Sequence, residues 1–103
     1  MTPDDLLTGA RGSDREAPPG ATPLVRALWL EARGDWNAAH QIAQDDDGAD
    51  AAWVHAYLHR KEGDAGNAAY WYGRAGRPVA TGAFDDEWRR IAAELLGRSS
   101  RVR

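Results

Sequence analysis

Two histidines and a glutamate lie close together in the stretch HAYLHRKEGD, which covers residues 55–64. His55 and His59 are four positions apart, so in a helix both imidazoles lie on one face, and Glu62 follows in the next turn. Two imidazole nitrogens and a carboxylate oxygen can hold a divalent metal such as Zn²⁺ and leave one position for water. A further ligand, His40 or an acidic residue, would come from another helix. One interpretation of the pattern is therefore a mononuclear metal site, as in a small metal-dependent enzyme or a metal sensor.

Two other interpretations of the same residues remain open at this stage. Zinc proteases typically carry the order HExxH on a helix, and in this chain Ala56 takes the place of that glutamate. His55 and His59 are equally compatible with packing residues whose ring nitrogens bond to backbone carbonyls or to Glu62. A third interpretation assigns the two histidines and Glu62 to a peptide-binding groove.

A second candidate surface lies on the helix that follows. Asn67, Tyr70 and Arg74 are three and four positions apart, and Arg77 comes shortly after them. Aromatic and arginine side chains contribute strongly to protein interfaces. These residues therefore join the histidine face in the expected interaction surface. The alternative is a solvated helix face that carries one amphipathic tyrosine.

Composition narrows the possible functions. The 103 residues are enough for one small domain with one core. A formal net charge of -3 argues against nucleic acid as a partner, because phosphate binding needs an excess of basic side chains. The chain contains no cysteine, which excludes disulfides and thiolate ligands. Its serines, at positions 13, 99 and 100, fall in expected tails, so a serine nucleophile is not expected.

Hydropathy gives no indication of a membrane protein. No stretch approaches the roughly 18 apolar residues of a spanning helix, and the N-terminal MTPDDLLTGARGSD lacks the apolar run of a secretory signal. We therefore expect a cytoplasmic protein with no membrane partner. We also expect no intrinsic catalysis and no cofactor, with a divalent metal such as zinc as the alternative.

Proline, glycine and acidic residues divide the chain into segments. Residues 1–22 are rich in glycine, proline and charge, which predicts a flexible leader. A single helical domain is expected over residues 23–97, followed by a flexible tail over residues 98–103.

Apolar residues at helical spacing predict five helices within that domain. Four of them form two helical hairpins, at about 24–46 and 50–76. The fifth is an amphipathic capping helix at about 85–96. The fold class is therefore all-α.

The two hairpins also match one another at an offset of 29 positions without a gap. Gly34 aligns with Gly63, and Asp35 aligns with Asp64, as a turn and a helix cap would. The match is confined to apolar, turn and cap positions, which is typical of a repeated helical hairpin.

The second hairpin resembles known helical repeats. The spacing of its glycine, alanine and aromatic residues is similar to that of tetratricopeptide repeats, and NAAYWYGRAG is similar to the end of Sel1-like repeats. Together, HAYLHRKEGD and NAAYWY also resemble a family of small uncharacterised bacterial proteins. The residues that carry the tetratricopeptide spacing are Gly63, Asp64, Ala68, Tyr72 and Ala75.

The repeat resemblance covers residues 24–78, and the first hairpin departs from it at Ala43, where the second has Tyr72. It implies close antiparallel helices and the binding of a protein or peptide. We therefore expect a small helical-repeat module for protein interaction. Two repeats with one cap leave apolar ends uncovered, so a homodimer is a further expectation.

Overall fold

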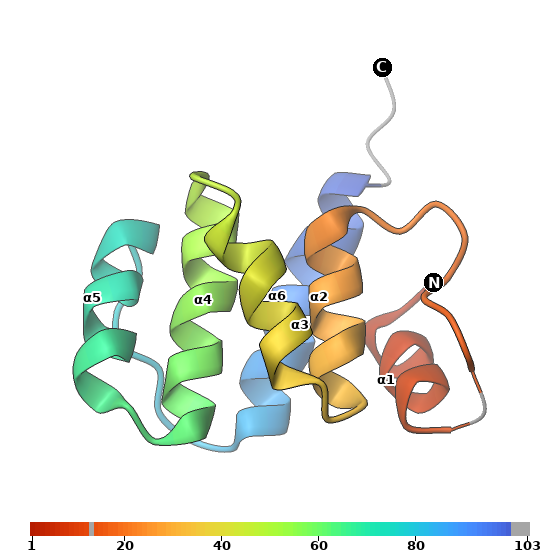
Figure 1. Cartoon of the computed structure of the whole chain (residues 1–103), viewed down its shortest axis with the longest axis horizontal. Coiled ribbons are helices and arrows are strands. Elements are labelled where there is room, and N and C mark those ends of the chain that lie inside the picture. The colour runs from red at the N-terminus through yellow and green to blue at the C-terminus, as the bar shows by residue number, and fades with distance from the viewer. Residues whose placement is uncertain (13, 100–103) are drawn as a thin grey trace.

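The computed structural model describes residues 1–12 and 14–99, and every regular element within them is a helix (Figure 1). The helices are α1 (Pro3–Arg11), α2 (Pro23–Ala32), α3 (Trp36–Gln44), α4 (Ala49–Glu62), α5 (Ala65–Ala75) and α6 (Phe84–Ser99). This confirms the expected all-α class. Over the same residues, no helix combines the length and apolar character needed to cross a bilayer.

Helices α2 and α3 form one adjacent pair, and α4 and α5 form another. The turns inside the two pairs are alike: Gly34 and Gly63 have φ angles of 96° and 92°, a region that favours glycine. The next residue in each turn, Asp35 or Asp64, caps the following helix by accepting a hydrogen bond from a backbone N–H. The match at an offset of 29 positions therefore corresponds to equal turns and equal caps.

Helix α4 lies between α5 on one side and α2, α3 and α6 on the other, and it contacts all four (Figure 1). Each of residues 51–59 is buried. Small alanines on several sides of the helix let its neighbours approach closely, and Trp53 and Tyr57 fill the remaining space. The face with His55 and His59, which the sequence placed outside the apolar face, is therefore covered as well.

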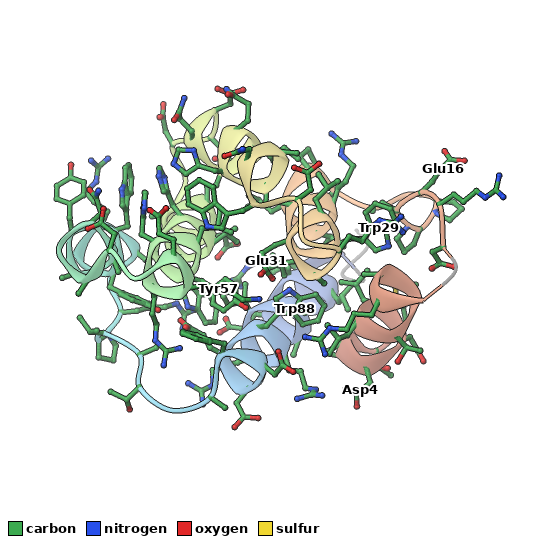
Figure 2. The ribbon with its side chains drawn as sticks, turned by 60° about the horizontal axis from the view of Figure 1, so that its bottom comes forward. Asp4, Glu16, Trp29, Glu31, Tyr57 and Trp88 are labelled. Carbon is green, nitrogen blue, oxygen red and sulfur yellow. The ribbon has the colours of Figure 1, made fainter. Side chains whose placement is uncertain are left out.

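Helix α6 packs against α1, α2 and α4, whereas α3 packs against α2 and α4 only. Helices α3 and α6 thus lie on opposite sides of the layer that α2 and α4 form (Figure 2). Trp88 fixes α6 to α2 because its Nε1–H donates to the Leu28 carbonyl over 3.1 Å. The other buried apolar residues of α6 are Ile91, Ala92 and Leu95.

The C-terminal boundary differs from the sequence expectation. Helix α6 continues beyond the expected end near residue 96 and reaches Ser99. Arg98 stabilises this last turn by donating to both carboxylate oxygens of Asp50, at 2.6 and 2.8 Å. Residues 98 and 99 of the expected tail are therefore helical, and the rest of the tail, residues 100–103, lies outside the described residues.

The structure also corrects the expected flexible leader over residues 1–22. Helix α1 begins with a capping box between Thr2 and Asp5 and packs against α2 and α6. Arg11, in its last turn, pairs with Asp85 of α6 over 2.9 Å. The composition of residues 1–22 did not indicate this helix, because only three side chains of α1 enter the core. They are Leu6, Leu7 and Ala10.

Two buried glutamates bind donors inside the helix bundle. The first is Glu31 of α2, which points toward Tyr57 of α4 in Figure 2. Its Oε1 accepts a hydrogen bond from the Tyr57 hydroxyl over 3.4 Å. Lys61 also bonds to this carboxylate.

The second is Glu87 of α6, which is 3% exposed. Its carboxylate accepts hydrogen bonds from the Tyr72 hydroxyl at 2.6 Å and Trp53 Nε1 at 3.3 Å. Arg60 pairs with the other oxygen over 3.0 Å. Donors from α4 and α5 thus satisfy a charge that α6 brings into the core, which holds the three helices in register.

Candidate metal centre

The three histidines of the chain gather at one place in the structure. His40 comes from α3, and His55 and His59 come from consecutive turns of α4. Candidate ligand nitrogens of all three lie within 4.8 Å of one another. The Nε2 atoms of His40 and His55 are 3.0 Å apart. We call these three residues the histidine cluster.

Local structure explains why His40 faces α4. Asp35 caps α3, and the small residues Ala39 and Ala43 are its buried contacts, so α3 can approach α4 closely. Trp36 sets the rotation of the helix because its Nε1–H donates to the Leu58 carbonyl of α4 over 2.8 Å. His40 lies one turn after Trp36, on the same side of α3.

Two tryptophans flank the cluster. The Trp36 ring stacks on His40 with ring centroids 4.8 Å apart. The Trp71 ring, from α5, stacks on His55 at 3.9 Å. Both tryptophans are half-buried. Stacked rings fix the imidazole planes and reduce the number of rotamers that the histidines can adopt.

Glu62 contacts the cluster through His59. Its Oε2 lies 2.7 Å from His59 Nδ1. An ionised carboxylate only accepts hydrogen bonds, so Nδ1 carries the proton and Nε2 of His59 stays free to bind a metal. Carboxylates that hold a ligating histidine in this way are common around protein metal sites. Glu62 therefore lies where it can orient His59, and it also belongs, with His59 and Asp64, to a second group of candidate ligand atoms within 4.8 Å of one another.

Burial favours the neutral, metal-binding form of two of the imidazoles. Burial is the main cause that lowers the pKa of His55 to about 4, and the charges of His40 and His59 lower it further. The pKa of His40 is lowered by burial and by the charge of His59, while Glu62 acts in the opposite direction. A lowered pKa means that no proton has to be removed from these two side chains at neutral pH before a metal binds.

The geometry is close to that of a metal site. With Zn–N distances of about 2.0–2.1 Å, two ligands of a tetrahedral ion lie roughly 3.3 Å apart. The His40 and His55 nitrogens, at 3.0 Å, need to separate by only a few tenths of an ångström to reach that spacing. The His40 and His55 nitrogens are thus close enough to share one ion, and His59 offers a third candidate nitrogen within 4.8 Å of them.

The second predicted surface is only partly assembled. Tyr70 is 55% exposed, and Arg74 donates to its hydroxyl over 2.9 Å. Asn67 is exposed too, but its amide donates to the α5 cap Asp64. Arg77 does not join this group, because its guanidinium lies 3.5 Å above the Trp53 ring and its charge pairs with Glu94.

Sequence reasoning proposed His40 only as one option for the additional ligand. The available signal was the i, i+4 spacing of Trp36 and His40, which marks a single aromatic face on α3. The role of Trp71 had no comparable signal, because the partner of an aromatic ring depends on which helix packs against it.

Comparison with known proteins gives no match to a family model, to a curated protein or to a solved structure.

Proposed function

We propose that this protein binds a transition-metal ion through His40, His55 and His59. The observation that carries the proposal is that all three histidines of the chain, from two helices, bring ligand nitrogens within 4.8 Å of one another. His55 and His59 are 4% and 8% exposed, and buried polar side chains need a hydrogen-bond partner or a bound ion.

The ligand set favours particular metals. Three imidazoles suit Zn²⁺, Cu²⁺, Ni²⁺ or Co²⁺, whereas Mg²⁺ and Ca²⁺ prefer oxygen ligands. Zinc is our first choice because three imidazoles and one solvent position make up the four-coordinate set that is typical of this ion. We propose a sensing role for the bound ion, without intrinsic catalysis.

The proposed fold is two tetratricopeptide-like or Sel1-like hairpins with α6 as a cap. Equal turns at Gly34 and Gly63 and equal caps at Asp35 and Asp64 support this proposal. In such a fold the histidine cluster lies where the first hairpin meets the second, since α3 belongs to one and α4 to the other.

The test is metal content by elemental mass spectrometry. Untagged protein is incubated with Zn²⁺, freed of unbound metal and compared with the His40→Ala variant. We expect one zinc ion per chain in the parent protein and loss of stoichiometric zinc in the variant. Gln44→Ala is the matched control, because Gln44 is an exposed polar residue of the same helix. Absence of bound metal in the parent protein, or full retention in His40→Ala, would contradict the proposal.

A protein-interaction role is the second candidate, and the exposed face of α5 favours it. Helix α5 packs mainly against α4, and Tyr70 with Arg74 lies on its exposed surface. We propose a second copy of this chain as the partner of that face. Sedimentation equilibrium at high protein concentration tests this: a dimer that Tyr70→Ala weakens supports it, and a strict monomer contradicts it.

A further inference from the structure

We propose that a metal held by the histidine cluster keeps a fourth coordination position open and that this position takes a small anion such as hydroxide or azide. This inference rests on the proposed metal binding and goes further by assigning the class of ligand that the bound ion accepts.

The first argument is that the two carboxylates grouped with His59 are held in other contacts within the described part of the chain. The three histidines are all used as ligands, and the chain has no cysteine. The nearest carboxylates belong to Glu62 and Asp64, and with His59 they lie within 4.8 Å of one another.

Both carboxylates are already engaged. Glu62 binds the Nδ1 side of His59, at 2.7 Å, which is the side of the ring away from the lone pair on Nε2. Asp64 caps α5: one of its oxygens accepts from the Asn67 backbone N–H at 3.3 Å, and the other accepts from the Asn67 amide at 2.7 Å. Moving Asp64 to a metal would remove this cap, which is worth about 1 kcal/mol.

The second argument is charge. Three neutral imidazoles leave the full double charge on a bound divalent ion, and such an ion binds anions and lowers the pKa of its water to about 7. Loss of a proton from the metal-bound water would place hydroxide at the fourth position.

The third argument is access from solvent. His55 and His59 are buried on α4, but His40 is only half-buried, and so are the two tryptophans that flank the cluster. Helix α4 would therefore hold the ion on its buried side, through His55 and His59. The side of the ion next to His40 would face solvent. A site with three protein ligands and one solvent position is typical of metal centres that exchange a ligand, whereas closed four-ligand sites are structural.

The experiment uses untagged protein loaded with Co²⁺, whose visible absorption reports the number and type of its ligands. We titrate the Co²⁺ protein with sodium azide and expect a saturable spectral change that fits one azide per metal. If Co²⁺ does not bind at all, the proposed function fails and the inference fails with it. If Co²⁺ binds but azide leaves the spectrum unchanged, metal binding stands and the open position is disproved.

A pair of variants separates an open site from one that Glu62 closes. Glu62→Gln is expected to respond to azide as the parent protein does, with cobalt affinity about 10–100-fold weaker because His59 loses its charged partner. A response in Glu62→Gln alone would show that the carboxylate is the fourth ligand, and would overturn the inference. Glu16→Gln is the matched control, since Glu16 is exposed in the segment between α1 and α2 (Figure 2).

Discussion

The Nε2 atoms of His40 and His55 lie 3.0 Å apart, although fifteen positions and a helix boundary separate the two residues in the chain. At this distance one ring donates a hydrogen bond to the other, or both nitrogens bind the same metal ion. Since α3 and α4 meet here, whatever bridges the two nitrogens also ties the first helix pair to the second.

Acid should destabilise the protein through His55. Its pKa is about 4 in the folded protein, against an ordinary value of 6.5, so between these pH values the unfolded chain binds more protons than the folded one. The contribution of His55 to the free energy of unfolding should therefore be fully present above pH 6.5 and be lost as the pH drops toward about 4. One pKa unit corresponds to about 1.4 kcal/mol, which gives a loss of about 3 kcal/mol over the whole range.

Urea unfolding at pH 7, 6 and 5 in the presence of a chelator measures this effect. His55→Gln is the comparison, because glutamine stays neutral while His40 and His59, which face the same space, are unchanged. The variant should show a weaker dependence on pH. An equal dependence in both proteins would assign the acid sensitivity to other groups.

Zinc should stabilise the folded protein and protect α3 most. At a zinc concentration about 100 times the dissociation constant, the gain in unfolding free energy is about 2.7 kcal/mol. Amide hydrogen exchange of α3 should slow on adding zinc, because this short helix buries only Ala39 and Ala43 and gains a bond to α4 through His40. A chelator should reverse the effect, and His40→Ala should show none of it.

Glu87→Ala should destabilise the protein strongly. The change removes the acceptor of Tyr72, Trp53 and Arg60 and leaves the arginine charge half-buried without its partner. Breaking a buried ion pair costs about 3–5 kcal/mol. Asp86→Ala is the control: this neighbour has a 75% exposed side chain, so its loss should cost well under about 1 kcal/mol. Chemical denaturation of both variants gives the comparison.

Leu6→Ala tests whether α1 belongs to the domain. Leu6 is 1% exposed within the common core, and truncating a buried leucine costs about 2–5 kcal/mol. The same change in a flexible leader would cost nothing measurable. Thr8→Ala, at an exposed position of the same helix, should leave the thermal unfolding midpoint nearly unchanged.

The positions of most helices were predictable because their signals are local. Gly34 and Gly63 mark turns by their backbone freedom, and Asp35 and Asp64 mark helix starts by their side-chain acceptors. The missed elements were those in which a distant partner supplies the stability. Helix α1 depends on the core that α2 and α6 offer it, and the last turn of α6 depends on Asp50.

The candidate site divides in the same way. The sequence by itself put His55 and His59 on one face of a helix, since a spacing of four residues is a property of any α-helix. Only the tertiary structure brought His40 to them, turned Glu62 toward the Nδ1 side of His59 and set Trp36 and Trp71 against the rings. These contacts depend on how closely α3 and α5 approach α4, and that distance is fixed by the packing of small side chains between helices.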